Sequence, residues 1–269
     1  MRDEGRPLPF ARAVRAVFDL SLEGMVWTRR TLLMGLLVGF PVLAAVGYRV
    51  FLAVRPEAPL PPAADLYAVA VAIYWIRNVL PLAALFFATA LVADEVEGRT
   101  LTYLLTRPLT RPSIFAGKFA AYLVTTLSLA LPSVVVTFFV LLSARGWDAV
   151  GPAVGDLFRD LGVVALALVA YGAFFALLGV LLKRPVVPGL LFLYGWELLA
   201  NLPGYLPRFT LTAWLRSLVH HRPAEEGLAG LFQQVLPAGP GLVVLVTVSA
   251  LFLAAAAWIF SSREYVLEQ

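Results

Sequence analysis

The sequence contains no cysteine, and its only two histidines, His220 and His221, are adjacent. Without cysteine, a disulfide framework, a thiolate metal site and a cysteine nucleophile are all excluded. The histidine pair also lacks the glutamate and the four-residue helical spacing of a zinc-protease helix. We therefore expect no metal site and little capacity for acid–base catalysis.

Charged residues are scarce as well. They make up 14% of the chain, against about 25% in an ordinary soluble domain, whereas hydrophobic residues reach 61%. A globule of 269 residues cannot hide so many apolar side chains from water, which excludes a soluble enzyme. The apolar residues form runs near twenty long rather than short alternating segments, which excludes an outer-membrane-type barrel. The composition predicts an all-α, polytopic membrane protein.

Six apolar runs are candidates for transmembrane helices. They cover residues 31–54, 66–93, 119–142, 161–182, 186–202 and 241–260. The first run, at 1.5 Å per residue, is about 36 Å long, enough to cross a hydrocarbon core of about 30 Å. The connections between the runs are mostly short, so we expect one membrane domain over residues 1–269 and no separate soluble domain.

An even number of spans puts both termini on one side of the membrane, and the basic residues indicate which side. Thirteen Lys and Arg residues border the side of the termini, and seven border the other side. Since cytoplasmic segments are enriched in basic residues, both termini are predicted to be cytoplasmic. The formal net charge of +4 is small, and we expect no nucleic-acid partner.

Residues 11–30 have the pattern of an amphipathic helix. At 100° per residue, Arg12, Arg15, Asp19, Glu23 and Arg30 fall within one arc, and the opposite side is apolar. We expect this helix to lie in the inner membrane interface, the alternative being a helix packed on a partner. The outer connection 203–240 has two further apolar periodic segments and is predicted to hold two short interfacial or re-entrant helices.

The connection 94–118, between the second and third spans, has an apolar face. Leu101, Leu104 and Leu105 follow helical spacing, and Pro108 ends the segment. An apolar helix face in the cytosol suits the groove of a partner protein. Contact with lipid headgroups is the alternative that periodicity alone leaves open.

This connection resembles the permease subunits of type-2, exporter-like ABC transporters. The resemblance lies in an acid, a Gly-x-Thr, a Leu-Leu-x-x-Pro-x-x-Arg and a later Gly-Lys that opens the next span. The residues that carry it are Glu95, Glu97, Gly98, Thr100, Leu104, Leu105, Pro108, Arg111, Gly117 and Lys118. The six spans and the interfacial N-terminal helix are also similar to this family.

The resemblance implies that 94–118 is a coupling loop, with Leu101 among the residues that dock on a separate ATPase. Two permease copies, expected from the resemblance to form a homodimer, would pair with two ATPases in the prokaryotic cytoplasmic membrane. ATP and magnesium would then belong to the partner, because this chain lacks a phosphate-binding loop: Phe119 follows its only Gly-Lys. The implied function is an ATP-driven permease, an exporter, that performs no covalent chemistry itself.

Two ionisable residues fall within the predicted spans, at a cost of about 2.5–3.5 kcal/mol each at the bilayer centre. Arg77 can reach the outer headgroups with its long side chain, whereas Glu197 lies nearer the midplane. The two residues can instead form an ion pair, or Glu197 can line a transport path. These alternatives remain open from the sequence.

Other features bear on helix packing. The small residues Gly172, Ala176 and Gly179 let two helices approach closely, either within one subunit or between two. Pro81 and Pro132 are predicted to kink or locally open their helices.

Two rival functions remain. A stand-alone carrier or channel is expected to have more intramembrane charge and repeat symmetry. A membrane assembly factor is the second rival, and an intramembrane enzyme would need a paired catalytic set at membrane depth.

Overall fold

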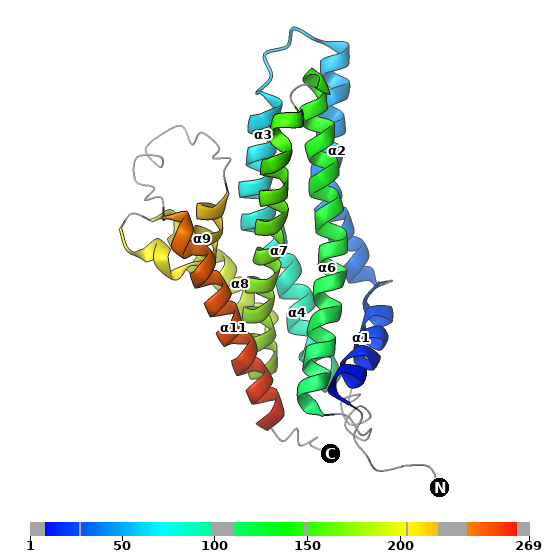
Figure 1. Cartoon of the computed structure of the whole chain (residues 1–269), viewed down its shortest axis with the longest axis vertical. Coiled ribbons are helices and arrows are strands. Elements are labelled where there is room, and N and C mark those ends of the chain that lie inside the picture. Colours follow the sequence, from blue (N-terminus) through cyan, green and yellow to red (C-terminus); the bar gives the residue numbers. More distant parts are fainter. Residues whose placement is uncertain are drawn as a thin grey trace.

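The computed structural model describes residues 9–26, 28–97, 110–147, 150–202, 204–219 and 236–262, with side chains left out for 92–97 and Arg145. Within these ranges every regular element is helical, which confirms the all-α prediction. The helices form an elongated bundle, in which α1, the end of α4, the start of α6 and the end of α11 lie at the same end (Figure 1).

Five of the six predicted spans are helices long and apolar enough to cross a membrane. They are α2 (Arg29–Val54), the continuous run of α3 (Ala63–Val69), η1 (Ala70–Val79) and α4 (Leu80–Glu97), then α6 (Arg111–Leu142), α7 (Val150–Leu181) and α11 (Ala238–Ser262). Several extend beyond the apolar run that predicts them. α6, for example, starts eight residues before the predicted span.

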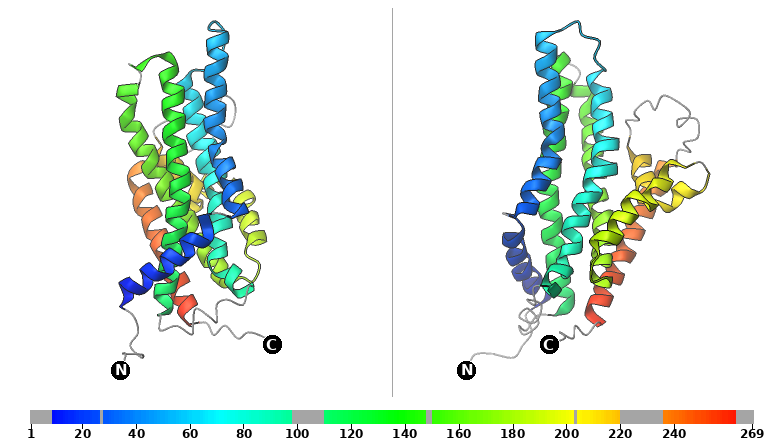
Figure 2. Two further views of the ribbon diagram at one scale, coloured as in Figure 1. Left: turned by 90° about the vertical axis from the view of Figure 1, so that its right-hand side faces the viewer. Right: turned by 180° about the vertical axis from the view of Figure 1, so that it is seen from behind.

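The fifth predicted span, 186–202, is broken. It forms the nine-residue helix α8 (Val186–Tyr194) and then a 3-10 helix, η4 (Trp196–Asn201). α8 and η4 stand on the same flank of the bundle as α11 (Figure 2). A membrane crossing by this segment, and with it the sixth span, stays a prediction.

The outer connection contributes a short 3-10 helix, η5 (Leu206–Phe209), and α9 (Leu211–Leu218). The predicted first short helix is thus present, with Leu211 and Leu215 buried. The second one, at 228–235, lies outside the described residues, and so do His220 and His221.

The amphipathic N-terminal segment is α1 (Phe10–Val26), and it crosses the lower part of α6 (Figure 2). Ala13 and Val17 are buried on its inner side, while Arg12, Arg15 and Glu23 are exposed. This burial fits the two predicted faces, and the buried side packs on this chain's own α6. A position in the membrane interface stays a prediction.

The core lies where α4, α6 and α7 meet, and glycines set how closely they pack. A Cβ on Gly179 of α7 would lie 2.7 Å from the Thr89 backbone oxygen of α4, and one on Gly172 would meet the Tyr122 ring of α6. These contacts show that the predicted small-residue stripe serves packing within one subunit.

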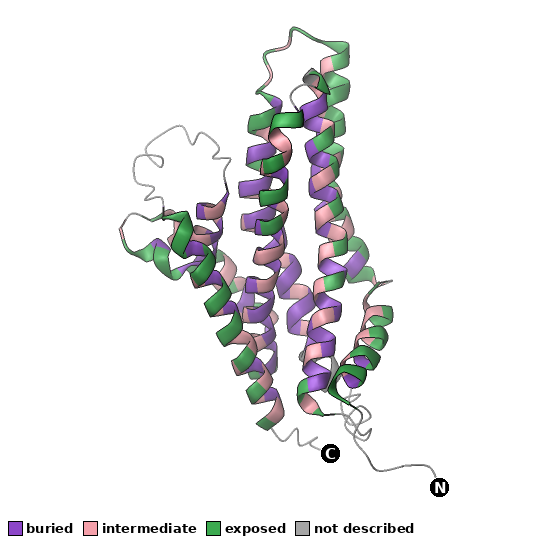
Figure 3. Cartoon of the chain, viewed as in Figure 1, coloured by how far each residue is buried: buried purple, intermediate pink, exposed green. Residues whose placement is uncertain are grey.

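The outer helices α2 and α11 are covered much less. Only 17% of the most apolar stretch of each is buried, against 67% for α7. Figure 3 shows this contrast as exposed green residues along α11 and the upper part of α2, and purple along the inner helices. The exposed faces are apolar, with Leu36, Leu43 and Leu251 more than three-fifths exposed, as expected for surfaces that meet lipid or another subunit.

Candidate functional site

The helices that flank the predicted coupling segment are tied together at their ends. Lys118, buried in α6, donates a hydrogen bond from Nζ to the Leu91 carbonyl oxygen of α4 at 2.7 Å. At the start of α6, Arg111 donates from Nη1 to the Ser261 carbonyl oxygen of α11 at 3.0 Å. These two hydrogen bonds join α6 to α4 and to α11.

Gly117 explains how α1 reaches this end of the bundle. A Cβ at this position would lie 2.7 Å from the Val14 carbonyl oxygen and 2.9 Å from the Val17 Cβ, both on α1. No side chain fits there without moving α1, so only glycine allows this close crossing. Gly117 and Lys118 thus join α6 to α1 and to α4, respectively.

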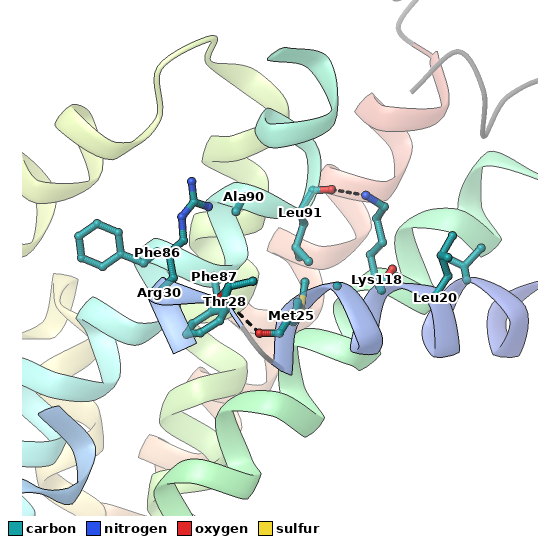
Figure 4. A pocket seen from close by; sticks show the side chains of 12 residues that line it. Leu20, Met25, Thr28, Arg30, Phe86, Phe87, Ala90, Leu91 and Lys118 are labelled. Atoms are coloured by element: carbon teal, nitrogen blue, oxygen red, sulfur yellow. Dashed lines mark hydrogen bonds between the residues drawn. The ribbon is translucent and has the colours of Figure 1, made fainter. Parts of the chain in front are cut away.

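A cavity of about 240 Å³ lies beside this junction, enclosed by α1, the start of α2, α4 and α6 (Figure 4). Its floor is buried and includes Phe87, Leu91 and Lys118, and its rim is exposed at Leu20 and Arg30. Most lining residues are apolar. Between α1 and α2, the Thr28 hydroxyl accepts a hydrogen bond from the Thr31 backbone N–H at 3.2 Å, which caps the start of α2.

A second polar cluster is built on the π-helix η1 (Ala70–Val79), which ends two residues before Pro81. Proline lacks an N–H and its ring crowds the carbonyl four residues earlier, so the predicted local opening occurs next to it. Asn78 donates from Nδ2 to the Ile73 carbonyl oxygen at 2.6 Å, within this widened turn. π-Helical segments are rare and often mark functional sites.

Asn201 joins two arginines in this cluster. Its Oδ1 accepts a hydrogen bond from Arg77 Nη1 at 3.2 Å and one from Arg216 Nη1 at 3.1 Å. A cavity of about 130 Å³ adjoins it, lined by Arg77, Asn78, Leu193, Tyr194, Glu197 and Leu198. The side chain of Arg77 is thus held by an amide at the edge of η4.

Glu197 is 7% exposed and binds the start of α9. Its two carboxylate oxygens accept the backbone N–H groups of Leu211 and Thr212 at 3.0 and 2.9 Å. The first N–H groups of a helix have no partner within it, and the helix dipole favours a negative charge there. Glu197 therefore fixes α9 to η4, and the hydroxyl of Thr212 pairs with Tyr171 of α7 at 2.8 Å.

Comparison with known proteins identifies the chain's relatives. The family model described as "ABC-2 family transporter protein" matches residues 65–265. The chain belongs to the ABC-2 transporter family. A search of curated proteins found no match. The chain is therefore an integral membrane permease of an ABC transporter. Members of this family are membrane transport subunits and generally non-catalytic.

The match begins at residue 65, inside α3, and covers the later described elements through α11. It leaves out α1 and α2. Both polar clusters on α4, α6 and η4 lie within the matched range. The α1 side of the larger cavity lies outside it.

The predicted docking residues of this ABC-2 permease are only partly described. The backbones of Glu95 and Glu97 belong to the last turn of α4, and Arg111 opens α6. The remaining predicted docking residues lie outside the described residues: Gly98, Thr100, Leu101, Leu104, Leu105 and Pro108.

The two predicted intramembrane charges of the permease line the same small cavity, yet each has a different partner. Arg77 donates to Asn201, and Glu197 accepts from the α9 backbone. Neither partner was predicted. Asn201, Leu211 and Thr212 could have been found only by knowing how the chain folds between η4 and α9, where Gly204 has a positive φ of 93°.

The sequence reasoning also missed Asp160, which is fully buried in α7 and adjoins Tyr67 of α3. The predicted span begins one residue later, at 161, so Asp160 fell in a polar segment assigned to a connection. The sequence does contain one indication that the helix starts earlier: the helical spacing of apolar residues continues N-terminally to Leu157, which is buried on the same helix.

Proposed function

We propose that this protein is the permease of an ATP-driven exporter in a prokaryotic cytoplasmic membrane, with both termini cytoplasmic. Two copies assemble with two separate ATPase subunits, whose ATP hydrolysis drives substrate across the membrane. The observation that carries this proposal is the family match over residues 65–265, which coincides with the helical bundle and with four of its five long apolar helices.

Coupling is assigned to the connection between α4 and α6. The ends of those helices are joined through Lys118 and Leu91, and Arg111 adds the end of α11. α4 in turn packs against α7 in the core, at the Thr89–Gly179 contact. A push on the connection by an ATPase would thus reach the central helices through direct contacts.

The pairing of two copies is supported by the apolar faces that the single chain leaves uncovered. α2 and α11 each bury little of their most apolar stretch within one subunit. Lipid can cover part of these faces, and a second copy can cover another part by close packing of side chains.

The proposal is tested by co-purification. Leu104→Asp and Leu105→Asp each place a charge on the predicted apolar docking face, and we expect both to lose the ATPase from the affinity-purified complex. Thr106→Asp is the matched control, because on the predicted helix it lies on the opposite side and should keep the ATPase. Size-exclusion chromatography and thermal unfolding of each permease check that it is folded.

Retention of a full complement of ATPase by both leucine variants would overturn the docking assignment. If the wild-type protein itself purifies from its native cells with no ATP-hydrolysing subunit, the stand-alone carrier or the assembly factor becomes the better explanation.

A further inference from the structure

The larger cavity, beside α1, has the chemistry of an anion site joined to an apolar slot. Two cations line it: Arg30 at the exposed rim and Lys118 in the buried floor. Phe86, Phe87 and Leu91 supply much of the apolar wall. Among the described lining residues there is no acid, since the carboxylates of α1 at 19 and 23 are exposed and outside the lining.

The cavity lies where lipid headgroups are expected to reach the protein. Its rim combines the end of the amphipathic helix α1 with the first turn of the apolar span α2. Such a helix rests at the boundary between headgroups and acyl chains. Basic pockets between membrane helices on the cytoplasmic side, where we place the α1 end, attract anionic lipids. The arrangement matches an amphiphile with a negative head and an apolar tail.

The volume limits what can enter. About 240 Å³ is below the roughly 300–1,000 Å³ of a site that encloses a small molecule. The cavity therefore suits one segment of a ligand whose remainder stays in the bilayer. A lipid meets this condition because its second chain can remain among neighbouring lipids.

We propose that this cavity binds an anionic phospholipid from the leaflet on the α1 side, with its phosphate near Arg30 and part of one acyl chain between α1 and α4. The lipid would fill the space between the N-terminal helix and the helix that leads into the connection to α6. This proposal rests on the membrane insertion of the chain and on the proposed cytoplasmic orientation of the α1 end, and not on ATPase coupling or on the exported substrate.

Gly24 offers a direct way to fill the cavity. It lines the cavity, and a Cβ built on it meets no atom within 4 Å. Gly24→Leu should therefore add a side chain to the cavity lining, with a Cβ that meets no clash. Gly47→Leu is the matched control, since Gly47 on α2 is exposed, has equally open surroundings and lies outside the lining.

A second pair of variants tests the charge. Arg30→Gln removes the cation at the rim, and Arg29→Gln removes its exposed neighbour, which is not among the lining residues. One cation near a lipid phosphate contributes enough that its loss should weaken binding about fivefold. Arg29→Gln should change binding much less.

The experiment measures thermal unfolding of the purified full-length protein, with whatever subunits accompany it, in mixed micelles of detergent and lipid. A ligand that binds the folded state raises the unfolding temperature. We expect phosphatidylglycerol to raise the unfolding temperature of the wild type more than phosphatidylcholine does. Gly24→Leu and Arg30→Gln should lose most of this difference, and Gly47→Leu and Arg29→Gln should keep it. Native mass spectrometry then counts phosphatidylglycerol molecules retained per chain.

The proposal is overturned if phosphatidylglycerol and phosphatidylcholine act equally on the wild type, or if all four variants keep the response. It is also overturned if Gly24→Leu keeps the lipid response but reduces the amount of co-purifying protein, because a protein segment then occupies the cavity. Should Gly24→Leu fail to fold, the Arg30→Gln and Arg29→Gln pair still decides the question.

Discussion

Glu197 is a buried acid, and each of its carboxylate oxygens has a hydrogen-bond partner. Both oxygens accept N–H groups at the start of α9. Glu197→Gln keeps one acceptor but turns an NH2 group toward a backbone N–H, which leaves a buried donor unpaired at a cost of about 1–3 kcal/mol. We expect a clear fall in the thermal unfolding temperature of the detergent-extracted protein. Glu57→Gln, at an exposed residue, should leave it unchanged.

Combining Glu197→Gln with Arg77→Gln separates this explanation from an ion pair. Since Arg77 donates to Asn201, the double variant should be no more stable than Glu197→Gln alone. Recovery of stability in the double variant would instead indicate that the two charges compensate each other.

At the scale of residues, the sequence predicted the packing best where a residue type has a single structural role, as glycine has in close helix contacts. Gly172 and Gly179 were predicted to allow close packing, and both lie against side chains or backbone of neighbouring helices. The partners of Arg77 and Glu197 could not be predicted, because they depend on how the chain folds back between η4 and α9. Asp160 was missed because a polar residue at a helix end looks like a loop residue until the helix is seen to continue.

At the scale of elements, the contact between α4 and α7 is governed by one glycine. A Cβ on Gly179 would lie 2.7 Å from a backbone oxygen of Thr89, which cannot move aside as a side chain end could. Gly179→Leu should therefore separate the helices and destabilise the protein by about 1–3 kcal/mol or more. The measurement is again thermal unfolding in detergent.

Gly162 on the same helix provides the control for that substitution. It is exposed and has no atom within 4 Å of an added Cβ. Gly162→Leu should be neutral or slightly stabilising, because leucine favours the helix over glycine by roughly 0.5–1 kcal/mol. Equal effects of the two leucines would show that the Thr89 contact does not control the packing.

The length of apolar runs predicted the long helices, because a helix that crosses lipid must be apolar for about twenty residues. The same signal could not reveal that 186–202 is a short helix followed by a 3-10 helix. Hydropathy measures apolar content and not the continuity of hydrogen bonding. Only Pro81 indicated an irregularity near the π-helix η1, and a proline does not specify whether a helix bends or widens.

At the scale of the whole molecule, the topology makes a prediction that the absence of native cysteine renders easy to test. Thr110→Cys directly precedes α6 and Ser262→Cys ends α11, and these helix ends lie at the α1 end of the bundle (Figure 1). Glu57→Cys lies between α2 and α3, and Gly151→Cys lies in the first turn of α7, at the other end. All four positions are exposed. In intact cells a membrane-impermeant thiol reagent should label the second pair only.

Cell lysis should make the first pair reactive, which serves as its internal control. Labelling of Thr110→Cys in intact cells would reverse the proposed orientation, and the connection between α4 and α6 could then not meet a cytoplasmic ATPase. Labelling of one member of a pair without the other would contradict the arrangement of the long helices.

The crossing of α1 over Gly117 also sets an order of events in time. Val17 meets its partner on α6 only after about 100 further residues have been made, which at roughly 5–20 residues per second takes about 5–20 s. During that interval the first helix has no α6 to cover its apolar side, and the membrane surface is the nearest apolar phase. The contact between α1 and α6 at Gly117 therefore forms late in synthesis, and we expect α1 to lie on the bilayer surface until then.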